Sequence, residues 1–369
     1  MLKRLRIFFI LLFIVAVGFY YRASYKEKTF DYMSFIMAKA INMKAKSSEQ
    51  TEGQENINTI EDTVISEKNK TSNSESFNLE DILSQNNGIM FLETTDRMDP
   101  PALVLCAIES AARIYYDRPI IFFMKGLNEI KSEEDEKIAR KHFPTLLSFK
   151  NIYLFPLKME EIFKDTPLLH WYEKINPKTE SHWIHVSADG TRLALIWKYG
   201  GIYMDTDIIS IRPIPVERFM AVESFAYSSN GVFGLSQHHK FTWLSMENFV
   251  QNYDGGRWGH QGPQLFTRVL KQFCNISEFS ILGDTMCRNI TLLNPQRFYP
   301  ISYPSWRLYY QVWENLPTFN DSYALHLWNY MNSEHRTMTT GSNTLVEHLF
   351  QQFCPSTYGA LLWNESIHL

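Results

Sequence analysis

The chain has short apolar runs separated by polar and charged segments from residue 87 onward, and this pattern predicts strands alternating with helices. A helix is predicted after Pro100-Pro101, with Leu103, Ala107 and Ala111 on one face. A densely charged stretch at 131–141 is typical of a solvated helix. This order predicts an α/β domain with a mostly parallel central sheet. The predicted buried strands are 87–94, 119–124 and 151–155.

A second helix is predicted between Ser187 and the Gly200-Gly201 pair. Ser187 is a suitable N-cap, which places Asp189 in the first turn. An apolar stripe at helical spacing follows, and the two glycines end the helix, one of them in the left-handed conformation. A new strand begins at residues 202–204, directly before the sequence Asp205-Thr206-Asp207.

Asp205 and Asp207 are the candidate chemistry of this segment. If residues 205–211 continue extended, side chains two positions apart point to the same side, and the two carboxylates face one place. Their repulsion becomes favourable when a hard cation such as Mg²⁺ or Mn²⁺ lies between them and a phosphate ligand. The alternative is a solvated acidic turn, because short motif matches often mislead. Asp189 and Arg192 share a helix face, as an ordinary ion pair or as groups that hold a sugar or phosphate.

The N-terminal residues predict a membrane anchor. Basic residues in 1–6 precede the uncharged run 7–21, which we interpret as a signal-anchor helix with a cytoplasmic tail. A cleaved signal peptide is the alternative, although the bulky residues 19–21 do not suit a cleavage site. The polar region 22–78 is predicted to be a stem, because most of it is too polar to fold alone, and 79–369 to be the folded domain.

The charge balance argues against a nucleic-acid-binding protein, and the cysteines and glycosylation sequons favour a lumenal domain. The formal net charge is −4, and no basic stripe is present beyond the N-terminus. Four cysteines permit two disulfides in three connectivities, of which we favour a local Cys274–Cys287 bridge. Five Asn-x-Ser/Thr sequons are expected of a chain whose folded domain is lumenal, and they occur at Asn69, Asn275, Asn289, Asn320 and Asn364.

The motif Asp189-x-x-Arg192, followed by Gly-Gly-x-Tyr-x-Asp-x-Asp, resembles that of retaining sugar transferases with an Asp-x-Asp site. More of the chain resembles the family that holds the α1,4-N-acetylglucosaminyltransferases and the α1,4-galactosyltransferase of globoside synthesis, with the closer match to the former. The matching stretches lie between about residues 80 and 358 and include FLETTDRMDPP, WKYGGIYMDTDIISIRPIP, WGHQGPQLFTRVL, NPQRFYPISY and YALHLWN.

This resemblance implies a GT-A-like fold, Mn²⁺ or Mg²⁺, a UDP-sugar donor and a retaining reaction in the Golgi membrane. It implies transfer of N-acetylglucosamine from UDP-GlcNAc to a terminal β-galactose of O-glycans. UDP-galactose with a lactosyl lipid is the alternative, and a non-catalytic sugar-binding module is a third. Because no nucleophile is identifiable, we favour attack from the face that the leaving group vacates.

The resemblance also implies roles for individual residues. Asp205 and Asp207 would bind metal and diphosphate, and Asp189 and Arg192 would hold the donor sugar. The remaining implied positions are Glu93 and Thr94 near the uridine, and His326, Trp328 and Asn329 in a C-terminal element over the diphosphate, with His326 also a metal ligand. A buried histidine satisfied by backbone is the alternative for His326. His260 and Gln261 are weak candidates for the acceptor site.

Overall fold

The computed structural model describes residues 78–85, 87–363 and 367. The predicted tail 1–6, anchor 7–21 and stem up to residue 77 lie outside the described residues. Within the described part, no helix has both the length and the apolar character needed to cross a membrane.

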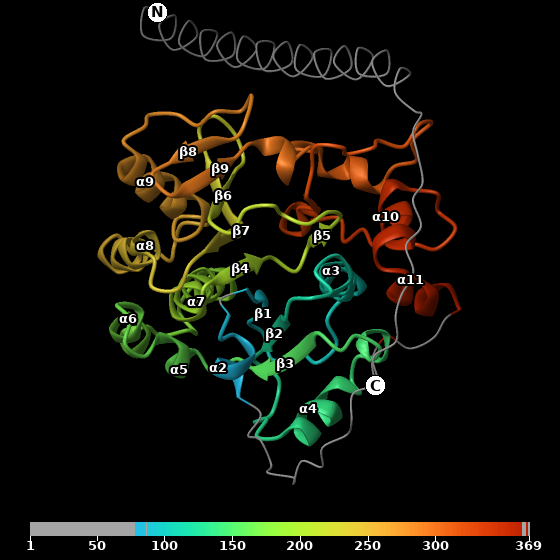
Figure 1. The fold of residues 1–369 in the computed structure, drawn as a ribbon, viewed down its shortest axis with the longest axis horizontal. Coiled ribbons are helices and arrows are strands. Elements are labelled where there is room, and N and C mark those ends of the chain that lie inside the picture. The colour runs from blue at the N-terminus through green and yellow to red at the C-terminus, as the bar shows by residue number, and fades with distance from the viewer. Residues whose placement is uncertain (1–77, 86, 364–366, 368–369) are drawn as a thin grey trace, which may run out of the picture. The chain divides into compact units, whose positions relative to one another are not determined.

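An eight-stranded sheet forms the centre of the described domain, in the order β3-β2-β1-β4-β7-β6-β9-β8 (Figure 1). Strands β3, β2, β1 and β4 are mutually parallel, β7 is antiparallel to β4 and β6, and β9 is parallel to β6. Only β7 and β8 therefore oppose the common direction, and the predicted mostly parallel sheet is confirmed. The strands are β1 (Ile89–Glu93), β2 (Ile120–Met124), β3 (Ile152–Pro156), β4 (Gly201–Met204), β6 (Phe219–Val222), β7 (Ser228–Leu235), β8 (Thr285–Cys287) and β9 (Ile290–Leu293).

Alternate side chains of the strands pack into two hydrophobic cores, one on each face of the sheet. In β1, Ile89 and Phe91 join one apolar cluster, whereas Met90 and Leu92 join the other. Figure 1 shows α3, α10 and α11 on one side of the sheet and α5 to α9 on the other. The helices are α2 (Leu79–Ile82), α3 (Ala102–Ile114), α4 (Glu133–Arg140), α5 (Met159–Phe163), α6 (Leu168–Lys174), α7 (Trp183–Tyr199), α8 (Lys240–Gln251), α9 (Pro263–Cys274), α10 (Leu345–Phe353) and α11 (Pro355–Leu362), with 3₁₀ turns η1 (Pro144–Leu146), η2 (Pro295–Arg297), η3 (Tyr303–Tyr310) and η4 (Asn329–Met331).

Helix α7 begins one turn earlier than the sequence predicts. Its N-cap is His182, and the predicted cap Ser187 lies inside the helix, where its hydroxyl donates to the Ile184 carbonyl. The extra turn forms because Trp183 stacks on the Trp171 ring at 6.0 Å between centroids. Asp189 is therefore a buried residue of the second turn and not a residue of the first.

The Gly200-Gly201 pair ends α7 as predicted, and both residues have positive φ. Gly201 also allows β4 to approach β1, because a Cβ there would lie 2.3 Å from the carbonyl oxygen of Gly88. The Ile202 amide donates to that same oxygen at 2.9 Å. The glycine pair thus sets the β1–β4 pairing that precedes the aspartates.

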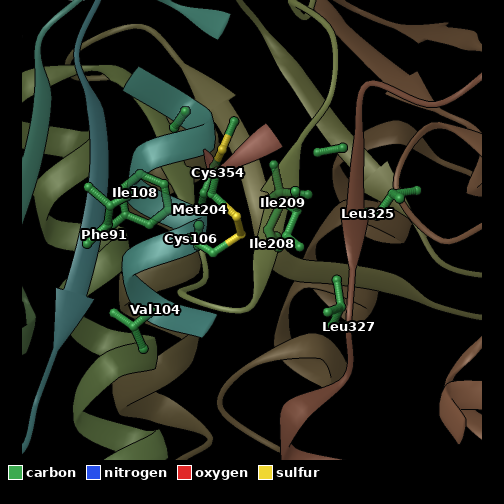
Figure 2. Packing of buried hydrophobic residues seen from close by; sticks show 14 of the residues in the cluster. Phe91, Val104, Cys106, Ile108, Met204, Ile208, Ile209, Leu325, Leu327 and Cys354 are labelled. Carbon is green, nitrogen blue, oxygen red and sulfur yellow. A yellow bond between two sulfur atoms is a disulfide. The ribbon is translucent and has the colours of Figure 1, made fainter. Parts of the chain in front are cut away.

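Two disulfides lie in the described domain. The predicted local disulfide, Cys274–Cys287, is present and joins the end of α9 to β8. The long-range disulfide, Cys106–Cys354, spans 248 residues and ties α3 to the junction of α10 and α11 (Figure 2). It fixes the C-terminal helices to the core.

Candidate active site

The aspartate pair lies at the carboxyl edge of the sheet, beside the point where strand order reverses. The chain runs outward through β1, β2 and β3 and then returns to β4 next to β1. Such a reversal leaves a crevice that binds ligands in open α/β sheets. The end of β4 therefore lies where a nucleotide-type ligand is expected.

Residues 205–207 form a turn, so the expectation that the chain continues extended through them is wrong. The Ile208 amide donates to the Asp205 carbonyl at 3.1 Å and closes this turn. The chain then enters β5 (Ile208–Ser210), which pairs antiparallel with β10 (Ala324–His326) in a separate two-stranded sheet. Ile208 is opposite His326 in this register, which brings a residue from more than 100 positions later to the aspartates.

Asp205, Asp207 and His326 converge on one place. One ligand atom from each lies within 4.8 Å of the others. The His326 Nε2 is 3.1 Å from an Asp207 oxygen, and the Asn329 amide donates to the other Asp207 oxygen at 2.8 Å. The carboxylates thus share a site as the sequence predicts, although a turn and not a strand aims them.

Buried neighbours fix the position of each ligand. Met204 and Ile208 flank the aspartate turn, and Leu325 and Leu327 flank His326; all four are fully buried. Figure 2 shows these four side chains packed in the core that also contains the Cys106–Cys354 bridge. Close packing leaves little freedom for the segments between such residues. The three ligand groups are therefore held on rigid elements.

Arg192 of α7 positions Asp205. Its Nη1 lies 2.8 Å from the Asp205 Oδ1 and donates to the Asn230 carbonyl at 2.9 Å, while the Tyr203 hydroxyl donates to the same Oδ1 at 2.6 Å. The Asp189 carboxylate is farther from Arg192, at 3.6 Å, and accepts from the Asn230 side chain at 2.6 Å. The predicted Asp189–Arg192 pair is thus part of a network whose shortest ion pair is Arg192–Asp205.

The protonation of this network follows from burial and charge. Burial raises the pKa of Asp189 to about 6, against the opposing effect of Arg192. Burial also raises the pKa of Asp205, Arg192 lowers it, and repulsion from Asp207 raises it further. For Asp207, burial acts upward, but the charge and hydrogen bond of His326 outweigh it and lower the pKa.

His326 is matched to Asp207. Burial lowers the pKa of His326. The charge of Asp207 and its hydrogen bond to His326 together outweigh this effect, so the pKa lies above the usual histidine value. Its other ring nitrogen, Nδ1, is buried without a hydrogen-bond partner among the described residues. The alternative of a histidine satisfied by backbone carbonyls therefore does not describe this side chain.

The three groups fit a divalent cation. Carboxylate oxygens and an imidazole suit Mn²⁺, and carboxylates alone suit Mg²⁺. The Asp205 Oδ1 is occupied by two donors, whereas its Oδ2 accepts no hydrogen bond from the described residues. A carboxylate oxygen without a donor, in one cluster with Asp207 and the His326 imidazole, is a ligand position that a cation would complete.

The predicted C-terminal element lies on this cluster. The Trp328 ring is 4.2 Å from the His326 ring, in an edge-on contact, and its indole nitrogen donates to the Ile301 carbonyl at 2.7 Å. The next residue, Asn329, binds Asp207 through its backbone. The three predicted positions of this element, His326, Trp328 and Asn329, are therefore joined to the aspartate turn.

Glu93 and Thr94 are at the same edge but do not contact the cluster among the described residues. Glu93 is the last residue of β1, the strand beside β4, and Thr94 follows it. The Glu93 carboxylate accepts from the amide and hydroxyl of Thr95, and the Thr94 hydroxyl donates to the Ile184 carbonyl of α7. They therefore lie at the carboxyl end of β1, next to the strand that leads into the aspartate turn.

Glu223 is a carboxylate of this edge that the sequence analysis missed. It follows β6, which runs parallel to β4, so both strands end at the same edge. Burial raises the pKa of Glu223, and the charge of His326 lowers it. The parallel direction of β6, which only the sheet topology reveals, is the signal that locates it.

The weak acceptor candidates His260 and Gln261 are used in the structure to hold a loop. The Gln261 side chain is buried and donates to the Phe249 carbonyl at 2.6 Å. The His260 Nε2 lies 3.0 Å from the Asn252 carbonyl. A hollow of about 660 Å³ lies at the opposite edge of the sheet, around residues preceding β1 to β3, and is remote from the ligand cluster.

Comparisons with known proteins agree with this geometry. Residues 234–361 match the family described as alpha 1,4-glycosyltransferase conserved region, and residues 101–226 match the glycosyltransferase sugar-binding region containing the DXD motif. Human alpha-1,4-N-acetylglucosaminyltransferase is 54% identical over 77% of this chain and 83% of its own length. Human lactosylceramide 4-alpha-galactosyltransferase is 38% identical over 74% and 77%.

Among solved structures, the galactosyltransferase LgtC in complex with donor and acceptor sugar analogues is 12% identical and covers 74% of this chain and 96% of its own. Its TM-score to this chain is 0.38. The assignment to a family rests on the two sequence relatives and the two family regions, and the aspartate–histidine cluster agrees with it. The chain therefore belongs to the alpha-1,4-glycosyltransferase family and is a glycosyltransferase.

Proposed function

We propose that the enzyme transfers N-acetylglucosamine from UDP-GlcNAc to the 4-hydroxyl of a terminal β-galactose on O-glycans, with retention of the α configuration. The observation that carries this proposal is the convergence of Asp205, Asp207 and His326 at the strand-order reversal of the sheet. The 54% identity to the N-acetylglucosaminyl relative, against 38% to the galactosyl relative, supports the choice of donor.

We further propose a GT-A-type arrangement of donor and metal. Asp205, Asp207 and His326 would hold Mn²⁺ or Mg²⁺, which neutralises the charge that develops on a departing diphosphate. Arg192 and Tyr203 keep the Asp205 carboxylate oriented through their hydrogen bonds to Oδ1. Glu93 and Thr94 would contact the uridine, a role that their position at the carboxyl end of β1, beside β4, supports.

The reaction breaks the bond between the anomeric carbon and the β-phosphate oxygen, and the electron pair leaves with UDP. The acceptor 4-hydroxyl oxygen forms the new bond on the vacated face, and its proton passes to the departing phosphate. Asp189 would orient the donor sugar by accepting from its hydroxyls, as its position beside Arg192 and Asn230 supports.

Front-face attack has a specific competitor in this structure, because Glu223 is a carboxylate at the same sheet edge. A nucleophilic Glu223 would form a covalent sugar adduct. Intact mass measurement after incubation with donor alone therefore tests the mechanism. We expect no adduct on the unmodified enzyme, whereas a sugar mass mapped to Glu223 would establish double displacement.

The activity test compares UDP-GlcNAc with UDP-galactose on a β-galactoside acceptor, with Mn²⁺, Mg²⁺ or chelator present. We expect metal-dependent transfer of N-acetylglucosamine, lost in Asp207→Asn. Asp117→Asn, an exposed aspartate preceding β2, is the matched control and retains full activity. Preferred transfer of galactose to a lactosyl lipid would instead support the function that the second relative's name indicates.

The setting of the enzyme is part of the proposal. We infer a Golgi type II membrane protein with a tail at 1–6, an anchor at 7–21, a stem at 22–78 and a lumenal catalytic domain at 79–369. Two disulfides support an oxidising compartment for that domain. Glycosidase sensitivity of the expressed chain, and its position in fractionated membranes, test the topology.

A further inference from the structure

We propose that Trp258 and Tyr330 form an exposed aromatic platform that binds a pyranose ring of the glycan acceptor. This inference rests on the proposed function, because it assigns the acceptor side of the same site. It goes further by naming side chains that neither the motif nor the relatives' names assign.

The two rings are stacked on each other in the open. Their centroids are 4.6 Å apart and their planes differ by 13°, yet Trp258 is 43% and Tyr330 is 53% exposed. They come from separate segments, the loop before α9 and the turn η4. Single exposed aromatic residues are common on protein surfaces and need no explanation. A contiguous exposed apolar surface is often a binding site.

One segment that carries the platform contacts the aspartate turn, and the other contacts the network around Arg192. On one side, the Asn329 amide that precedes Tyr330 binds the Asp207 carboxylate at 2.8 Å. On the other, Gly262 in the Trp258 loop packs so close to Asp189 that a Cβ would lie 2.7 Å from a carboxylate oxygen. The stacked pair therefore bridges the two sides of the site.

A third ring connects the platform to α7. His185 meets Tyr330 edge-on, with centroids 4.9 Å apart and an interplanar angle of 89°. Partial burial and the charge of Arg192 lower the pKa of His185, while Asp205 acts in the opposite direction. The platform thus lies within the electrostatic reach of the residues that hold Asp205.

The Trp258 loop is held from beneath, which makes the platform a formed surface. Gln261 donates to the Phe249 carbonyl, His260 contacts the Asn252 carbonyl, and Arg268 donates to the His260 carbonyl at 2.8 Å. A surface held in its binding geometry loses little conformational entropy when a ligand docks. The residues first suspected of contacting the acceptor therefore support the residue that we assign to it.

The exposure of the pair favours the acceptor over the donor nucleotide. A bound nucleotide is a small ligand that a pocket buries almost completely. A glycan acceptor inserts only its terminal sugar and leaves the rest of its chain in solvent, so its contact surface must open outward. Aromatic rings offer a broad apolar face for the C–H side of a pyranose, and the tyrosine hydroxyl and indole N–H offer polar contacts at the rim.

Steady-state kinetics on the full enzyme test this assignment with N-acetyllactosamine and a micellar lactosyl lipid as separate acceptors. For Trp258→Ala and Tyr330→Ala we expect the acceptor KM to rise about tenfold or more, the size typical of an aromatic anchor. The donor KM and the slow rate at which water hydrolyses UDP-GlcNAc to UDP should stay within about twofold of the parent values. We allow that variation for residues outside the donor site. Trp258→Phe should recover most of the acceptor affinity, because it restores an aromatic face.

Tyr116→Ala is the matched control, since Tyr116 is 79% exposed at the opposite edge of the sheet, and it should leave every parameter unchanged. Saturation-transfer NMR with UDP, the diamagnetic Mg²⁺ and N-acetyllactosamine measures acceptor binding even without turnover, and the signal should disappear in Trp258→Ala. An unchanged signal and acceptor KM in that variant would overturn the platform. If the parent releases UDP but binds neither β-galactoside, the platform also fails while the transferase function stands; absence of all UDP release defeats the proposed function itself. An effect with one acceptor alone shows which carrier the platform serves.

Discussion

Replacing Gly231 by alanine is a direct steric test of the Asp205 position. Gly231 lies in β7 beside β4, and its carbonyl accepts from the Asp205 amide at 2.8 Å. A Cβ at residue 231 would lie 2.8 Å from the Asp205 Oδ2, closer than carbon and oxygen approach without a shift. The backbone φ of Gly231 is not in the left-handed region, so alanine adds a clash and no backbone strain.

The added methyl group would clash with the Asp205 carboxylate, whose position is restrained by its neighbours. The Asp205 Oδ1 is held by Arg192 at 2.8 Å and by Tyr203 at 2.6 Å, so a displacement of about half an ångström stretches both contacts. Sites of this kind need their groups held within about 0.5 Å. We therefore expect kcat/KM to fall about ten- to a hundredfold, which corresponds to about 1.4–2.7 kcal/mol of transition-state stabilisation.

The assay is transfer activity as a function of Mn²⁺ concentration, with thermal unfolding measured on the same samples. Gly231→Ala should need more Mn²⁺ for half-maximal activity and should unfold within a few degrees of the parent. Gly359→Ala is the control, because nothing lies within 4 Å of a Cβ at this position in α11. It should keep full activity and gain about 0.5–1 kcal/mol of stability from helix propensity. Parental kcat/KM and Mn²⁺ dependence in Gly231→Ala would refute the proposed role of the Asp205 orientation.

Three further outcomes are expected. His326→Ala should raise the Mn²⁺ concentration for half-maximal activity at least about tenfold, and an unchanged metal titration would remove His326 from the ligand set. The pKa of Asp189, about 6, lies above its unfolded value, so its contribution to stability is present below pH 4 and is lost as pH rises to about 6. Urea unfolding of the ligand-free domain should therefore show a loss of about 3 kcal/mol over that range that Asp189→Asn lacks; identical pH slopes would contradict it. Replacing both cysteines of the long-range disulfide by alanine should cost about 5 kcal/mol, against about 3 kcal/mol for the local disulfide, because the closed loop is longer. A larger loss on removing the local bridge would contradict this order.

The sequence predicts those parts of the structure whose causes are local. The runs at 87–94, 119–124 and 151–155 are predicted to be strands because each contains at least four consecutive apolar residues, and β1, β2 and β3 occur there. The Gly200-Gly201 stop is equally local, since it depends on left-handed backbone conformations at one place. Patterns of this kind need no knowledge of the rest of the chain.

The features that the sequence misses depend on distant partners. Helix α7 starts at Trp183 because a ring on α6 stacks with it, which overrides Ser187 as a cap. The turn at 205–207 forms because β5 leaves the main sheet to pair with β10. His326 is indicated only by resemblance, and Glu223 is not indicated at all, because the direction of β6 is a property of the assembled sheet.

The dependence on distant partners explains why the catalytic cluster cannot form from its own motif. Asp205 is held within the first part of the domain, by Arg192 and Tyr203. Asp207, in contrast, is held from the C-terminal part: its carbonyl accepts from the Leu327 amide at 2.9 Å, and its carboxylate contacts His326 and the Asn329 amide. The β5–β10 pair and the long-range disulfide bring these two parts together. Two aspartates two positions apart in sequence therefore become one candidate metal-binding geometry only after the C-terminal segment has docked, which links completion of the fold to completion of the site.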